Sequence, residues 1–219
     1  MDFSLSEDQE AIRRAVAEIC ARFPDGYWRE ADAGADYPQE FVAALTEGGW
    51  LSILVPEEYG GAGLGMTEAA IVLEEINRSG GNGAACHAQM YTMGTLLRHG
   101  SEEQKRRYLP EIAAGRLRLQ AFAVTEPTTG SDTTRLATRA QRRGDGYVVH
   151  GQKTFISRVR QSDLMLLLAR TTPLEELDDR TRGISVFLVD LREAGDALDV
   201  RPLDVMINHH TCEVFIDGL

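Results

Sequence analysis

The sequence is poor in cysteine and in long apolar segments, and each shortage excludes a class of protein. Its three cysteines, Cys20, Cys86 and Cys212, lie far apart and form no Cys-x-x-Cys pair. This odd, scattered set argues against a disulfide scaffold and predicts reduced, buried thiols in a cytoplasmic protein. The longest apolar run, 164–169, is far too short to span a membrane, and the acidic N-terminus lacks the apolar core of a secretory signal. We therefore expect an intracellular protein without a membrane span.

Basic residues are also scarce. The chain has 23 Lys and Arg against 34 Asp and Glu, which gives a net charge of −11 and argues against a nucleic-acid partner. Only Lys105 and Lys153 are lysines, a bias toward arginine that either codon usage or anion recognition explains. With 219 residues and 43% hydrophobic residues, the chain has the composition of one large or two small globular domains.

The first half of the chain has helical spacing of its apolar residues. Capping boxes at Ser6 and Ser101 predict two helix starts, Pro38 opens a short helix, and Thr67 caps another. A longer helix is expected from Asn82 to residue 99, and the helix after Ser101 should stop before Pro110.

After residue 115 the pattern changes to short β-rich runs, with a tight-turn signal at residues 144–146. Six strands are predicted, at 117–124, 136–142, 147–157, 164–170, 184–190 and 212–216. No helical pattern separates them, which favours an antiparallel barrel or sandwich. The fold class is therefore α+β, with an all-α N-terminal domain over residues 1–115 and a β middle domain over residues 116–219.

The segment AFAVTEPTTGSD, residues 121–132, has the composition of a binding turn. Backbone N–H groups beside Gly130 and the hydroxyls of Thr125 and Ser131 suit an anionic or heteroaromatic ligand. A polar β-turn that satisfies its own backbone explains the same residues, and composition alone favours that interpretation. Glu126 is interpreted as a structural carboxylate that accepts local N–H bonds.

Three further segments carry weaker signals. In VVHGQKTFIS, residues 148–157, Phe155 offers a flat apolar surface and Ser157 a hydroxyl on the same strand face, although a core strand has the same pattern. The adjacent histidines of NHHTCEVF, residues 208–215, point to opposite sides of a strand and make a poor metal site. The glycine run at residues 60–65 fits neither a dinucleotide fingerprint nor a Walker A loop, and indicates a close turn.

Taken together and in order, these segments resemble the acyl-CoA dehydrogenase flavoproteins. The resemblance covers essentially the whole chain, through the blocks GGWLSILVPEEYGGAGLGMTEAAIVLEEI, HGSEEQKRRYLPEIAAG, AFAVTEPTTGSD, VVHGQKTFIS and TCEVFIDGL. It implies a helical N-terminal domain, a β middle domain and a C-terminal four-helix domain, of which the sequence to Leu219 matches the first two.

The resemblance also implies a cofactor and a substrate, FAD and an acyl-CoA thioester. The residues implied for FAD are Phe122, Val124, Thr125, Gly130, Ser131, Phe155, Ile156 and Ser157. Those implied for the acyl-CoA are Ser131, His87, Met90, Tyr91 and Gly94. Arg158 and Arg160 stand where the family commonly has a small Asn-Gly-Gly turn, and we expect this arginine pair to be solvated rather than bound to a CoA phosphate.

The family's general base, a glutamate of the C-terminal domain, has no counterpart in residues 1–219. The function implied is FAD-dependent α,β-dehydrogenation of an acyl-CoA, with electrons passed to electron-transfer flavoprotein or a similar acceptor. We expect the chain alone to be inactive and to self-associate. When the C-terminal domain is present, we expect a homo-oligomer, which the resemblance implies is a tetramer. The alternatives are a flavin oxidase or monooxygenase on the same scaffold, or a non-catalytic partner of a split flavoprotein.

Overall fold

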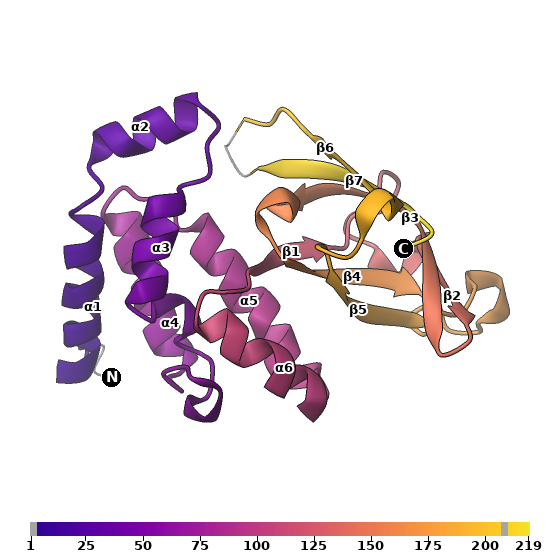
Figure 1. Ribbon diagram of the computed structural model, residues 1–219, viewed down its shortest axis with the longest axis horizontal. Helices are drawn as coiled ribbons and strands as arrows, with labels where there is room; N and C mark the ends of the chain where they lie inside the picture. The colour runs from indigo at the N-terminus through magenta and orange to yellow at the C-terminus, as the bar shows by residue number, and fades with distance from the viewer. Residues whose placement is uncertain (1–3, 207–209) are drawn as a thin grey trace. The chain divides into compact units, whose positions relative to one another are not determined.

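A computed structural model of the chain describes residues 4–206 and 210–219. The chain divides into two compact units, with the division between Arg118 and Leu119. The first unit is helical and the second is built on a β-sheet (Figure 1).

Six α-helices form the first unit, and their bounds follow the sequence pattern closely. They are α1 (Glu7–Cys20), α2 (Asp25–Ala33), α3 (Gln39–Glu47), α4 (Met66–Arg78), α5 (Ala84–His99) and α6 (Glu102–Ala113). Both predicted capping boxes are present: Ser6 accepts the N–H of Gln9, and Ser101 accepts the N–H of Gln104. The core is assembled from apolar faces of α1, α3, α4 and α5, and includes Phe41, which is fully buried.

Three details of the helical prediction are wrong. Helix α2 was not predicted, because it has no side-chain cap and no fully buried residue. Helix α4 begins at Met66, where Glu68 caps the backbone N–H of Gly65, and not after a Thr67 cap. Helix α6 continues through Pro110, since the burial of Leu109 and Ile112 on one face offsets the hydrogen bond that proline removes.

The second unit contains one seven-stranded sheet. Its strands are β1 (Leu119–Ala123), β2 (Arg139–Arg143), β3 (Gly146–Ser157), β4 (Leu164–Arg170), β5 (Ile184–Asp190), β6 (Leu198–Pro202) and β7 (Thr211–Asp217). The order is β1-β4-β2-β3-β7-β6, with β5 paired to β4. All six predicted strands are present, and the α+β class is confirmed.

The sheet differs from the prediction in being mixed. Strand β4 runs parallel to β1 and, at Arg170 and Arg139, parallel to β2, whereas the other pairs are antiparallel. A parallel pair needs a long connection. Here the β2–β3 hairpin lies within the segment between β1 and β4 and provides that length. Strand β6 was missed because it is short, carries Pro202 and lies at the edge of the sheet, where proline is tolerated.

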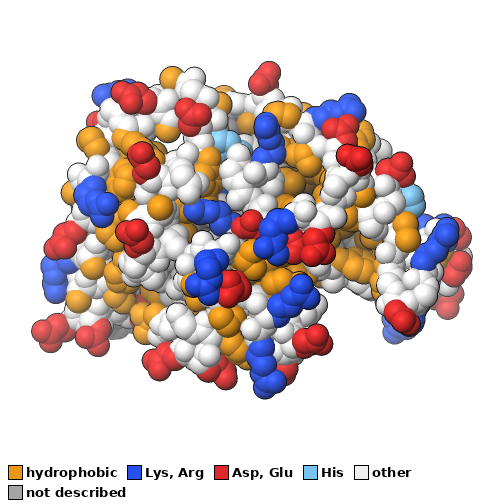
Figure 2. All heavy atoms as spheres, viewed as in Figure 1, with side chains coloured by type: hydrophobic (Ala, Val, Ile, Leu, Met, Phe, Trp, Pro, Cys, Tyr) orange, Lys and Arg blue, Asp and Glu red, His pale blue; other side chains and the backbone are white. Residues whose placement is uncertain are grey.

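The core of the second unit is separate from that of the first. It collects alternate residues of β1, β2, β3, β4 and β7, among them Ala121, Met165, Leu167 and Val214, which are fully buried. On the face of the molecule seen in Figure 2, acidic and basic side chains alternate over the surface without a patch of one sign.

Candidate functional site

The predicted binding turn and strand β3 lie side by side. The N–H of Thr154 donates to the carbonyl of Thr125 at 2.9 Å, and Nζ of Lys153 donates to the carbonyl of Val124 at 3.0 Å. Glu126 and Thr129 close the turn by exchanging two backbone hydrogen bonds, of 2.9 and 3.0 Å. The two segments singled out in the sequence, 121–132 and 148–157, therefore form one surface.

A β-bulge on β3 turns the ring of Phe155 outward. In the pairing of β3 with β7, Thr154 and Phe155 together oppose the single residue Glu213, since Lys153 pairs with Val214 and Ile156 with Cys212. Phe155 has φ of +57° and is 63% exposed. A left-handed backbone costs a side-chain-bearing residue about 1–2 kcal/mol. The chain thus presents an apolar ring to solvent in a strained conformation.

Polar groups with spare bonding capacity lie in the same two segments as this ring. Among the residues that the structure describes, the hydroxyls of Thr125, Ser131 and Ser157 have no side-chain hydrogen bond. Gly130 is exposed, and a Cβ added there would meet no atom within 4 Å. The fold itself does not require a glycine at this position.

The remaining residues predicted for the cofactor divide into two groups. Phe122 and Val124 are half-buried and occupy alternate positions from the core residues Ala121 and Ala123, so that they share the outer face of β1 and its extension. Ile156 differs, because its side chain is 2% exposed and belongs to the core. Only the backbone of Ile156 is available to a ligand.

Four of the five residues predicted for the acyl-CoA, all but Ser131, lie on helix α5, but not on one face. His87 and Tyr91 are exposed, one turn apart, with ring centroids 5.1 Å from each other. Gly94 continues this face, and a Cβ there would meet nothing within 4 Å. Met90 is 4% exposed and packs in the core of the helical unit, so its side chain does not join the other three.

A buried ion pair lies beneath the turn. Lys153 and Glu126 side chains are 0% and 3% exposed, with Nζ and Oε1 2.9 Å apart. Glu126 also accepts the N–H groups of Ala137 at 2.6 Å and Thr138 at 2.9 Å. Its interpretation as a structural carboxylate agrees with this geometry, although the donors come from distant segments of the chain and not from the turn itself.

Two opposing effects set the charge of this pair. Burial raises the pKa of the Glu126 carboxyl, but hydrogen bonds at Thr138, at Ala137 and from Lys153 outweigh burial and hold the pKa below the ordinary glutamate value. Burial lowers the pKa of the Lys153 ammonium, and Glu126 opposes that effect. A buried carboxylate that already accepts three hydrogen bonds is poorly suited to be a general base.

Sequence reasoning did not identify Lys153 as part of the site. The available signal was its inward position on β3, two residues from Gly151 and four from the core residue Val149, in a chain with only two lysines. A lone lysine at a core-facing strand position needs a buried partner.

The arginine pair after β3 corrects another expectation. Arg160 is exposed, as expected for a solvated side chain, but Arg158 is 5% exposed and has φ of +59°. The N–H of Arg158 donates to the carbonyl of His210 at 3.0 Å, which fixes this turn against the start of β7. His209, the other member of the histidine pair, lies outside the described residues.

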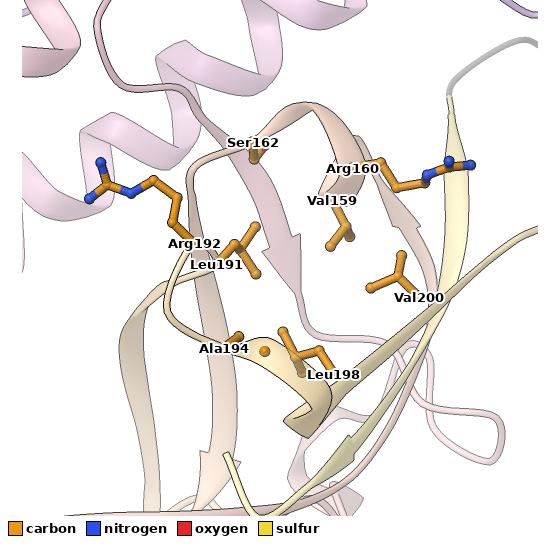
Figure 3. Close-up of a pocket in the computed structure, with 9 residues that line it drawn as sticks. Val159, Arg160, Ser162, Leu191, Arg192, Ala194, Leu198 and Val200 are labelled. Carbon is orange, nitrogen blue, oxygen red and sulfur yellow. The ribbon is translucent and has the colours of Figure 1, made fainter.

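A pocket of about 270 Å³ lies on the β unit, and its lining includes Val159, two residues after Ser157 (Figure 3). Its walls are the apolar side chains of Val159, Leu191, Leu198 and Val200, whereas the side chains of Arg160 and Arg192 point outward on opposite sides. Arg192 is already paired with Asp190 at 2.5 Å. None of the residues predicted for FAD or acyl-CoA lines this pocket.

The described part of the chain has neither a membrane-spanning helix nor a cluster of metal-ligating side chains. No helix there is both long and apolar enough for a transmembrane span. Within the same residues, no three or more His, Cys, Asp or Glu side chains are grouped so that they could hold a metal ion.

Comparison with known proteins gives consistent matches. One relative is an acyl-CoA dehydrogenase of Mycobacterium bovis, which is 34% identical over 94% of this chain and 60% of the relative's length. Another is a 3-(aryl)acrylate reductase of Clostridium sporogenes, which is 35% identical over 98% of this chain and 56% of the relative's length. Among solved structures, an acyl-CoA dehydrogenase from Geobacillus kaustophilus has 28% identity and a TM-score of 0.89. The match covers all of this chain and 57% of the Geobacillus chain.

A second solved structure, the ChsE4–ChsE5 complex from Mycobacterium tuberculosis, has 31% identity and a TM-score of 0.83. The match covers all of this chain and 55% of the matched chain of that complex. The chain thus spans little more than half the length of the proteins it matches. Residues 6–116 match the N-terminal domain of acyl-CoA dehydrogenases, and residues 121–219 match the middle domain. The chain belongs to the acyl-CoA dehydrogenase family.

Proposed function

We propose that this chain provides the FAD-binding and thioester-binding surface of an enzyme that dehydrogenates an acyl-CoA between its α and β carbons. The observation that carries the proposal is the outward ring of Phe155, next to Thr154, whose N–H binds the carbonyl of Thr125 in the turn. In such an enzyme FAD accepts the hydride that leaves the β-carbon. The chain's own part is to bind, to orient and to exclude water.

The residues around Phe155 fit a flavin by shape and by chemistry. The Phe155 ring supplies a flat apolar contact, and Phe122 of β1 and Val124, the residue after β1, supply further apolar side chains. The hydroxyls of Thr125 and Ser157 supply hydrogen-bond donors for the polar edge of a heteroaromatic ring. The empty space at the Gly130 Cα allows a ligand to approach the backbone closely.

A second group of residues is proposed for the thioester. Ser131 lies at the exposed end of the turn, where it would meet the entering acyl-CoA. His87, Tyr91 and Gly94 would line the acyl pocket from α5, whereas Met90 would act only by packing beneath them. The tilted His87–Tyr91 pair gives this face an aromatic, partly polar character.

The proton-abstracting base is proposed to come from outside these 219 residues. The chemistry needs a carboxylate within hydrogen-bond reach of the α-carbon proton. Glu126 is held by Lys153 and two backbone N–H groups, and Asp132 lies 3.5 Å from Arg180. We infer that the chain binds cofactor and substrate but needs the rest of the protein, or a second chain, for turnover. Electron-transfer flavoprotein or a similar carrier, and a homo-oligomeric assembly, complete the proposal.

The test is a flavin titration of the purified chain, read by absorbance after gel filtration. We expect retained flavin with a structured visible band, and affinity about tenfold weaker for Phe155→Ala, which corresponds to about 1.4 kcal/mol of ring contact. Tyr147→Ala is the matched control, because Tyr147 is another exposed aromatic residue of β3 and lies outside the proposed site.

Two results would contradict the proposal. Flavin that elutes entirely free of the wild-type chain would mean that these residues do not form a cofactor site by themselves. Equal affinities for the Phe155 and Tyr147 variants would mean that flavin binds elsewhere. Oxidation of an acyl-CoA by the chain with an artificial electron acceptor should be absent, and turnover would overturn the assignment of the base to another part of the protein.

A further inference from the structure

The Lys153–Glu126 pair ties together three segments that are distant in sequence. Lys153 is on β3, Glu126 follows β1, and the N–H groups of Ala137 and Thr138, which Glu126 accepts, precede β2. Lys153 makes a second bond, to the carbonyl of Val124 at 3.0 Å. One buried charge pair therefore fixes the turn from two sides.

The same pair lies directly next to the strained part of β3. Thr154, which donates to the Thr125 carbonyl at 2.9 Å, separates Lys153 from Phe155. Phe155 keeps its left-handed backbone only if the residues around it are held in place. With Lys153 and Thr154 both bonded to the turn, Phe155 projects outward and Ile156 returns to the core.

Stability alone does not account for an ion pair at this position. Replacing a buried ion pair by apolar side chains of similar volume is often neutral or stabilising, because both charges must be taken out of water. What two apolar side chains lack is direction: neither can hold the Val124 carbonyl or the N–H groups of Ala137 and Thr138. The pair sets geometry more than it adds free energy.

We propose that Lys153 and Glu126 are positioning residues, which hold the Thr125 turn and the outward Phe155 in the relative placement that flavin binding requires. This inference rests on the proposed function for its ligand, but its geometric part concerns the chain alone. Neither residue touches the ligand in this proposal; both act through Thr125 and Phe155.

The test compares the Lys153→Met/Glu126→Met double variant with the wild-type 219-residue chain. We expect a folded variant with a lower melting temperature, because the N–H groups of Ala137 and Thr138 and the carbonyl of Val124 lose their partners, together with flavin affinity at least about tenfold weaker and faster amide hydrogen exchange at Thr154, Ala137 and Thr138. Arg201→Gln is the matched control, since it removes an exposed ion pair with Asp199 in the same unit and should change neither flavin affinity nor exchange.

The outcomes separate this inference from the proposed function. A wild-type chain that binds no flavin refutes the proposed function, and the exchange rates then decide on the positioning role by themselves. A double variant with wild-type exchange at these three amides overturns the inference, as does wild-type flavin affinity. If the double variant does not fold, Glu126→Gln is used, because it keeps the shape and one acceptor oxygen while it removes the charge.

Discussion

Arg170 offers the sharpest test of what holds the β unit together. Its guanidinium is 4% exposed and donates to the backbone carbonyls of Leu136 at 3.0 Å, Arg180 at 3.1 Å and Arg182 at 3.1 Å, and also to that of Thr134. These carbonyls belong to the segment before β2 and to the loop between β4 and β5. No carboxylate is paired with Arg170 among the described residues. We consider its replacement by methionine.

Two large effects oppose each other in this substitution. A hydrogen bond to a charged group contributes about 1.5–3 kcal/mol, so four of them give roughly 6–12 kcal/mol. Keeping a guanidinium out of water costs several kcal/mol, which the substitution returns. The balance is a loss of about 3–5 kcal/mol, a large part of the roughly 5–15 kcal/mol that stabilises a typical domain.

The measurement is urea unfolding of the wild type, Arg170→Met and Arg170→Lys. Lysine should recover less than half of the loss, because one nitrogen cannot reach carbonyls from two separate segments. Arg192→Met is the control: this arginine is half-exposed and paired with Asp190, so its loss should cost no more than about 1 kcal/mol. If the free energy of unfolding of Arg170→Met is within about 1 kcal/mol of the wild-type value, the reasoning is refuted, because that difference is smaller than the contribution of a single hydrogen bond to a charged group.

Two further predictions concern the same unit. Gly151→Ala should lower the free energy of unfolding by about 1–3 kcal/mol, because the new Cβ would lie 2.4 Å from Oγ1 and 2.8 Å from Cα of Thr138. Gly130→Ala should change the free energy of unfolding by no more than about 0.5 kcal/mol, since its Cβ would meet no atom, but it should weaken flavin binding. Loss of the flavin effect at Gly130, or equal stabilities of the two variants, would contradict this. Hydrogen bonds that outweigh burial lower the folded-state pKa of Glu126. Its contribution to the free energy of unfolding is therefore complete above the unfolded-state pKa and is lost as the pH falls through the folded-state pKa. The free energy of unfolding should therefore fall less between about pH 5 and pH 2 for Glu126→Gln than for wild type. The control is Glu193→Gln, which changes an exposed carboxylate of the same unit, and parallel curves for all three proteins would count against the buried pair.

The sequence predicted best those elements whose own residues determine them. The capping boxes at Ser6 and Ser101 are local hydrogen-bond patterns, and they mark helix starts that the structure confirms. Strands β4 and β5 have the predicted bounds, since each is a continuous apolar run or alternation. The parallel pairing of β1 with β4 could not be predicted, because it depends on how a hairpin between them is folded, and not on either strand.

The site was predictable in its parts but not in its assembly. The turn at Thr125 and the ring of Phe155 were identified through the family resemblance, and the structure joins them by a backbone bond between Thr154 and Thr125. The bulge that exposes Phe155 leaves no trace in a period-two pattern, because it adds one residue to one strand only. The pairing of Lys153 with Glu126 spans 27 positions and was likewise invisible.

The departures from local rules gather in one part of the β unit. Four described residues other than glycine have positive φ. Three of them lie close together: Phe155 and Arg158 are three residues apart, and the N–H of Arg158 donates to the carbonyl of His210. This stretch adjoins the buried Lys153 charge and the exposed Phe155 ring. A sequence selected for stability alone would relieve the strain with glycine, shorten the bulge and bury the ring. Their occurrence together supports the proposal that a ligand binds at Phe155.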